Sequence, residues 1–328
     1  MGSMGSDPIF RAPPGEGLVR GKSALTPVYP VRGKSALTPV LPTRGRSAFA
    51  PVFVLVVVAV LLGACSMTRI AYSNATPVLT WALDDYFDLS DAQKDWVHER
   101  TEKLVKWHRV SELPDYQRLL QSALVMSEKP FTAAEAARTY QSGRALYYRL
   151  AEKMLPDMAD FLLKLDASQV VALERNLATA NAKLQRDNFK GTAEERAQRR
   201  TKKYLDYFQD YVGKLSPEQA AMVGTRVRAI PDFGEDWMAD RKLRQQEMIG
   251  LIRNKGTREQ TMAGLRRIIF DMDSLRRPEY VALVKQRDAR IFEMTAAVSD
   301  TLSAEQRAKL QKKIRGYIAD VAYLMAPG

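Results

Sequence analysis

The chain is poor in the residues that build disulfides, thiol active sites and metal centres. Its 328 residues include one cysteine and two histidines. A single cysteine cannot form an internal disulfide, so packing alone must hold the fold together. His98 and His108 are ten residues apart, which on one helix leaves them about 80° away from a common face. We therefore expect no metal site and no cofactor.

Sequence motifs of several enzyme classes are also missing. Residues 65–328 contain no HExxH zinc motif, no glycine-rich phosphate loop and no Gly-x-Ser-x-Gly nucleophile elbow. These motifs place a metal, a phosphate or a nucleophilic serine at defined points of a fold. Their absence favours a protein that is not an enzyme.

Acidic residues are outnumbered by basic ones, and the formal net charge is +12. The first 64 residues hold seven Lys or Arg and two Asp or Glu, which leaves +7 on residues 65–328. Such an excess favours anionic partners in general. The basic stretch Glu195–Tyr204 places Arg196, Arg199, Arg200 and Lys203 on one helical face. We interpret it as a solvated face; if it binds, the partners would be anionic headgroups or cell-wall polymers, and no nucleic acid is expected.

Long hydrophobic runs are limited to one segment, Val52–Leu62, of eleven residues. A membrane-spanning helix needs about 20 apolar residues, whereas the hydrophobic part of a secretory signal needs about 7–15. Arg44 and Arg46 precede the run, and Gly63 and Ala64 follow it. Two nearly identical twelve-residue units, VRGKSALTPVYP and VRGKSALTPVLP, lie upstream at residues 19–42. Residues 1–64 are thus predicted to be a repeat-containing leader that ends in a signal peptide.

The end of this leader, Leu62-Gly63-Ala64-Cys65, resembles the lipobox of bacterial lipoproteins. The resemblance implies cleavage between Ala64 and Cys65, lipid attachment (diacylglyceryl and an acyl chain such as palmitate) to Cys65, and contact with a membrane through that lipid. Ser66 follows the cysteine, which by the same resemblance implies sorting to the outer membrane of a Gram-negative cell, facing the periplasm. The alternative is a buried or chance cysteine after an ordinary signal peptide or signal anchor.

From Pro77 onward the apolar residues recur at helical spacing, and seven segments have the form of a capping box. In this motif an N-cap oxygen and a Glu or Gln three residues later satisfy two backbone N–H groups. The seven pairs are Ser90/Gln93, Thr132/Glu135, Asp166/Gln169, Thr192/Glu195, Ser216/Gln219, Thr257/Gln260 and Ser303/Gln306. The pattern predicts an all-α fold, an elongated bundle of about nine to eleven helices over residues 77–328. Residues 65–76 are expected to be a lipidated tether, and a possible internal boundary lies near residues 187–192.

Two segments behind the lipobox, WALDDYFDLSDAQ (Trp81–Gln93) and WHRVSELPDYQRLL (Trp107–Leu120), resemble a family of bacterial lipoproteins catalogued as a domain of unknown function. The resemblance is sharpest over residues 65–125. It implies an all-helical envelope lipoprotein and supplies no catalytic residues.

Three helix starts also resemble the Leu-Thr-x-x-Gln signature of Spy-type periplasmic chaperones. They are Leu89-Ser-x-x-Gln93, Leu215-Ser-x-x-Gln219 and Leu302-Ser-x-x-Gln306, with serine in place of threonine. This resemblance implies a holdase, whereas a shared preference for a good helix cap explains the same residues without it.

One cluster breaks a rule of helix electrostatics. Asp84, Asp85 and Asp88 fall in the last turn of the first predicted helix, where the macrodipole disfavours negative charge. Either the cluster binds a ligand or cation, together with His98 and His108, or cations such as Arg100, Lys103 or Arg109 on the next helix compensate it.

The sequence therefore leads to three functional hypotheses. The first is a lipid-anchored envelope protein that binds or scaffolds a partner, which could be another envelope protein. The second is a membrane-tethered holdase of the Spy type. The third is an enzyme that uses the Asp84, Asp88, His98 and His108 region, which requires these residues to meet in one cleft.

Overall fold

The structure, a computed structural model, describes residues 65–326. Over these residues it consists of helices and loops, which confirms the all-α prediction. The helices are α2 (Cys65–Ser73), α3 (Ala75–Phe87), α4 (Asp91–Ser111), α5 (Leu113–Met126), α6 (Ala133–Leu163), α7 (Ala167–Asn188), α8 (Ala193–Val212), α9 (Pro217–Arg228), α10 (Gly234–Asn254), α11 (Arg258–Phe270), the short 3₁₀ helix η2 (Met272–Ser274), α12 (Pro278–Asp300) and α13 (Ala304–Met325).

The described residues contain twelve α-helices, slightly more than the nine to eleven expected. Glu112 caps the end of α4, and α5 begins at the next residue, Leu113, with Pro114 in its first turn. Proline lacks the N–H that a helix interior needs, but it fits the first turn of a new helix. The helix beyond the expected number is α2, which occupies most of residues 65–76, the segment expected to be a tether.

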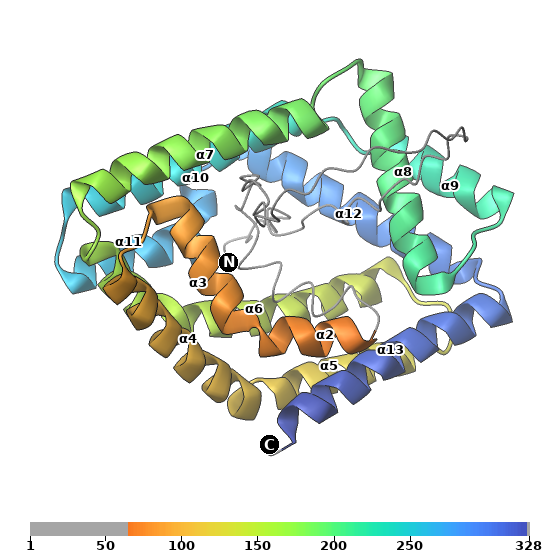
Figure 1. Cartoon of the computed structure of the whole chain (residues 1–328). Helices are drawn as coiled ribbons and strands as arrows, with labels where there is room; N and C mark the ends of the chain where they lie inside the picture. Colours follow the sequence, from red (N-terminus) through yellow and green to blue (C-terminus); the bar gives the residue numbers. More distant parts are fainter. Residues whose placement is uncertain (1–64, 327–328) are drawn as a thin grey trace, which may run out of the picture.

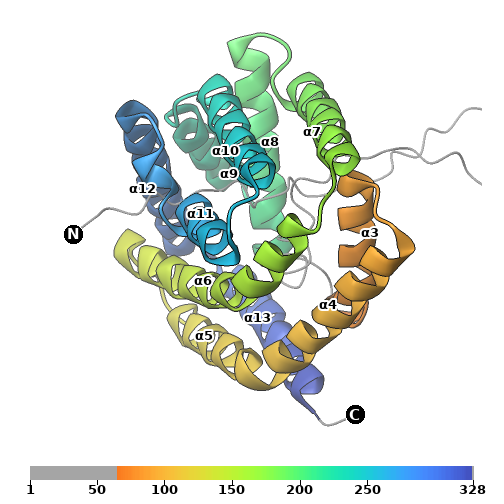
Figure 2. The ribbon, with the colours of Figure 1, turned by 90° about the vertical axis from the view of Figure 1, so that its left-hand side faces the viewer.

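The helices follow one another around a frame (Figure 1). Helix α7 packs on α10 along one side, and α13 packs on α5 along the opposite side. Helices α3 and α4 form one end of the frame, and α8 and α9 form the other. The view in Figure 2 shows α6 between α5 and α11, in agreement with its packing against both. Helix α13, the last in the chain, contacts α2, so the two ends of the described chain meet.

Three groups of buried apolar side chains hold the frame. The largest joins α3, α4, α6, α7, α10 and α11, and its fully buried members include Leu155 and Leu265. The second joins α8, α9 and α12 around Val223 and Met294. The third is smaller and joins α2, α5 and α13. Each helix therefore buries one stripe and exposes the other, as the apolar periodicity predicts.

Every one of the seven capping boxes is formed as the sequence predicts. In each, the N-cap side chain accepts a hydrogen bond from the N3 backbone, and the N3 side chain accepts one from the N-cap backbone. The predicted interruption near residues 187–192 falls at the loop between α7 and α8. Across residues 65–326, no helix combines the length and apolarity needed to cross a membrane.

Helix α2 is fastened to the rest of the fold by polar contacts as well as by packing. Arg69 Nε lies 2.5 Å from Asp320 Oδ1 of α13, and Asp320 is completely buried. The Arg69 guanidinium also lies over the Tyr323 ring, 4.2 Å from its centroid. On the other side, the Tyr72 hydroxyl lies 3.0 Å from His108 Nδ1 of α4. The part of α2 that contains Arg69 and Tyr72 is therefore an integral part of the helical body.

The substitution Arg69→Ala tests this attachment. It leaves the Asp320 carboxylate buried without its cation, so we expect the free energy of unfolding to fall by about 3 kcal/mol. Urea unfolding followed by circular dichroism measures the change. Arg315→Ala, at an exposed position of α13, the helix of Asp320, serves as the control. Equal unfolding midpoints for the two variants would contradict the attachment.

Candidate functional site

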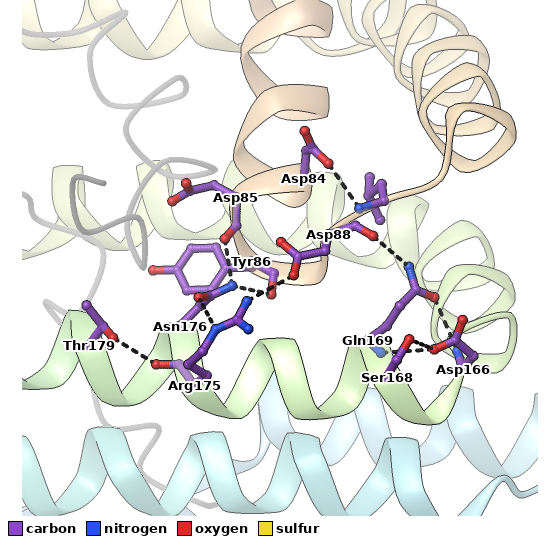
Figure 3. A network of polar contacts seen from close by, with 11 residues as sticks. Asp84, Asp85, Tyr86, Asp88, Asp166, Ser168, Gln169, Arg175, Asn176 and Thr179 are labelled. Carbon is purple, nitrogen blue, oxygen red and sulfur yellow. Dashed lines mark hydrogen bonds and ion pairs between the residues drawn. The ribbon is translucent and has the colours of Figure 1, made fainter. Parts of the chain in front are cut away.

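The aspartate-rich segment forms the turn between α3 and α4 (Figure 3). Asp84 and Asp85 lie in the last turn of α3, and Asp88 ends the helix in the left-handed conformation with φ of 50°. Asp84 Oδ1 accepts a hydrogen bond from the Leu89 backbone N–H at 3.0 Å, and its Oδ2 lies 3.2 Å from Lys94 Nζ. Asp84 thus bridges the end of one helix and the first turn of the next.

Helix α7 supplies the other partners of this turn. Arg175 Nη2 lies 2.9 Å from Asp88 Oδ2, and both side chains are more than half exposed. Such a pair contributes about 0–1 kcal/mol. Asn176 Nδ2 donates to the backbone carbonyls of Asp85 and Tyr86, at 2.9 and 3.1 Å. These carbonyls belong to the group that a helix end leaves without intrahelical partners.

Cations therefore compensate the cluster, but they are not the expected ones. Lys94 and Arg175 fill this role, whereas Arg100 pairs with Asp157 and Lys103 with Glu99. The reason is the direction of α4, which carries the positions of Arg100 and Lys103 away from the turn, while α7 packs beside α3. The turn is a helix junction held from two sides.

The two histidines lie elsewhere. His98 is about half exposed on α4, with Nε2 3.5 Å from Glu102 Oε1. His108 is buried near the far end of α4, and at about 1.5 Å per residue it lies roughly 30 Å along the chain path from the turn. The structure brings Asp84, Asp85 and Asp88 together, but it does not bring the histidines to them. Among the described residues, no group of three His, Cys, Asp or Glu side chains is arranged to hold a metal ion.

His108 takes part in the attachment of α2. Its Nδ1 lies 3.0 Å from the Tyr72 hydroxyl, and its ring lies 5.3 Å from the Tyr116 ring between centroids. Burial lowers the pKa of His108 to about 4 and raises that of Tyr72 to about 12. Both groups are therefore neutral at pH 7, which suits a hydrogen bond in an apolar site.

The capping glutamines at the aspartate-rich turn also form hydrogen bonds between helices. Gln93 of α4 and Gln169 of α7 donate to each other's Oε1, at 3.0 and 2.7 Å. Each Oε1 also accepts the backbone N–H of its own N-cap residue, Ser90 or Asp166. Gln169 Nε2 further approaches the Asp88 carbonyl at 3.5 Å (Figure 3). We call this arrangement the first glutamine junction.

A second glutamine junction has the same chemistry at the start of α9 and α13. Gln219 and Gln306 donate to each other at 2.9 and 2.8 Å, and both are buried. Gln219 also donates to the Thr301 carbonyl at 2.8 Å, and Gln306 to the Lys214 carbonyl at 2.9 Å. Each carbonyl lies two residues before the N-cap of the opposite helix. Two helical hairpins are thereby joined at each junction.

Sequence analysis found these caps but missed their pairing. The signal is present: the four paired boxes have leucine before the N-cap and glutamine at N3, as in Leu89/Gln93, Leu165/Gln169, Leu215/Gln219 and Leu302/Gln306. The boxes at Thr132, Thr192 and Thr257 lack one or both features. The residues behind the Spy-type resemblance thus belong to this set.

The basic stretch on α8 is used for loop contacts. Arg196 and Arg200 both pair with Asp232 in the loop between α9 and α10, at 2.6 and 3.1 Å. Lys203 Nζ lies 2.8 Å from Asn188 Oδ1 at the end of α7. Arg196 and Arg200 are about 27–28% exposed, so this face is less solvated than the sequence suggested.

The first glutamine junction can be tested by a double-mutant cycle. Gln169→Ala leaves Gln93 and the Asp88 carbonyl without their partner, so we expect a loss of about 1–3 kcal/mol in the free energy of unfolding. The double variant Gln93→Ala/Gln169→Ala should reveal a coupling of about 1 kcal/mol. Gln260→Ala is the matched control, because Gln260 caps α11 and is exposed. A coupling near zero would show that the pair does not hold the hairpins.

His108 should make stability depend on pH. Its folded-state pKa of about 4 lies below the unfolded value, so the unfolded chain binds the proton more readily. Stability is then complete above about pH 6.5 and is lost as the pH falls toward 4, by about 2 kcal/mol at pH 5. His108→Asn keeps a partner for Tyr72 but does not titrate. Urea unfolding at pH 7.5 and 5 should show a smaller decline for the variant, and equal declines would refute this role.

The comparisons with known proteins place the chain in a family. A family model described as a family of unknown function, DUF6279, matches residues 85–281. The match begins in the aspartate-rich turn and ends in α12, so it includes the first glutamine junction. No curated protein and no solved structure gives a significant match. The chain belongs to the DUF6279 family of unknown function.

Proposed function

We propose that this protein is a lipoprotein of the bacterial cell envelope, anchored through lipid on Cys65, which binds or scaffolds a partner. The observation that carries the proposal is the lipobox Leu62-Gly63-Ala64-Cys65 directly behind an eleven-residue apolar run. Two or more acyl chains anchor a protein stably, because each buried methylene contributes about 0.8 kcal/mol. Ser66 favours the outer membrane, with the helical domain in the periplasm.

Binding is favoured over catalysis because the polar clusters already have structural partners. The aspartates of the turn join α3, α4 and α7, and His108 attaches α2. His98 and His108 do not meet the aspartates in a common cleft. A partner would therefore bind to the protein's surface. Residues 65–328 carry a net charge of +7, which favours an anionic partner. That partner could be an envelope protein, anionic headgroups or a cell-wall polymer.

A membrane-tethered holdase is the second candidate. The observation that favours it is the threefold occurrence of Leu-Ser-x-x-Gln at helix starts, which is similar to the Spy-type signature. Suppression of a client protein's aggregation at near-stoichiometric amounts would support this activity. The structural use of these glutamines in the two junctions accounts for them equally well.

Fractionation of cell envelopes tests the anchor. We expect the wild-type protein in the outer-membrane fraction and the Cys65→Ala variant out of it, because the variant has no thiol to accept lipid. Ser66→Asp should move the lipidated protein to the inner membrane. Retention of Cys65→Ala in the outer membrane would contradict lipid anchoring, whereas an unchanged Ser66→Asp would contradict only the sorting step.

A further inference from the structure

Helix α2 starts at Cys65, so no flexible spacer separates the proposed lipid from the folded body. It is attached to α13, because the Arg69 guanidinium pairs with the fully buried Asp320 and stacks on Tyr323. At about 1.5 Å per residue, Ile70 lies only about 7.5 Å along the helix from Cys65. The interfacial layer of a bilayer leaflet is of similar depth. A lipid on Cys65 therefore places this part of α2 at the membrane surface.

The side chains next to the anchor suit such a surface. Ile70 is 54% exposed and Tyr323 is 60% exposed. Each lies two residues after a buried position, Thr68 or Val321, which on a helix is about 200° away and so points outward. Arg69 precedes Ile70 in the chain, and its partly exposed guanidinium covers the Tyr323 ring. An aliphatic side chain, a tyrosine and an arginine together are typical of the membrane interface.

We infer that the face formed by Arg69, Ile70 and Tyr323, the α2–α13 face, rests on the headgroup layer of the leaflet that receives the lipid of Cys65. This inference rests on the proposed lipid anchor and adds an orientation to it. Ile70 and Tyr323 enter the interfacial layer, beside the Arg69 guanidinium, which stays paired with Asp320. The opposite side of the frame, with α7 and α10 (Figure 1), then faces away from that membrane.

Cys65 is the only cysteine of the chain, and lipid attachment consumes its thiol, which allows a clean labelling experiment. Single cysteines are introduced into the lipidated protein as Ile70→Cys, Tyr323→Cys or Val171→Cys and labelled with a fluorescent maleimide. Val171, on α7, is the matched control because it is an apolar residue that is 61% exposed. The proteins are bound to vesicles of phosphatidylcholine and phosphatidylglycerol that contain a headgroup nitroxide lipid.

The inference predicts strong nitroxide quenching of the labels at positions 70 and 323 and little at position 171. Equal quenching at all three positions, with the protein bound to the vesicles, would overturn the orientation and leave the lipid anchor intact. A protein without the introduced cysteines that labels at Cys65 and does not float with vesicles would overturn the anchor, and the orientation with it. Urea unfolding confirms that each labelled variant is folded.

Discussion

The structure depends on the need of every helix start to satisfy its first backbone N–H groups. Capping boxes meet this need at seven helix starts, while α3, α5, α10 and α12 begin without a side-chain cap. Four of the boxes use a glutamine that also bonds to a glutamine of another box. One amide therefore completes a helix end and joins two hairpins, in a site that is half-buried at Gln93 and buried at Gln169, Gln219 and Gln306. Both junctions have the reciprocal glutamine pair and a bond from one glutamine to a carbonyl two residues before the opposite N-cap. The second junction adds the bond from Gln306 to the Lys214 carbonyl.

The sequence predicts the contacts within each capping box but not the contacts between two boxes. An N-cap and its N3 partner are three residues apart, so all seven boxes could be predicted. Gln93 and Gln169 are 76 residues apart, and Gln219 and Gln306 are 87 apart, so their pairing depends on how hairpins pack. The same limit applies to the aspartate-rich turn, where the need for cations was predictable but Arg175, from α7, was not.

Helix α2 is another element whose structure depends on residues far away in the sequence. Its nine residues begin at the cysteine that ends the lipobox, and a short segment at an anchor is expected to be a tether. Its helical structure is stabilised by Asp320, which lies 251 residues away from Arg69, and by His108 on α4. For the proposed function, this means that a lipid on Cys65 would hold the whole helical body in one orientation.

The proposed function depends most directly on the chemistry of Cys65, and the intact mass of the N-terminal peptide of the mature protein tests it. The account predicts a peptide that begins at Cys65 and carries the added mass of a diacylglyceryl group and an amide-linked acyl chain. A peptide that contains residues before Cys65, or an unmodified cysteine, would contradict lipid anchoring and, with it, the orientation of the α2–α13 face on a membrane.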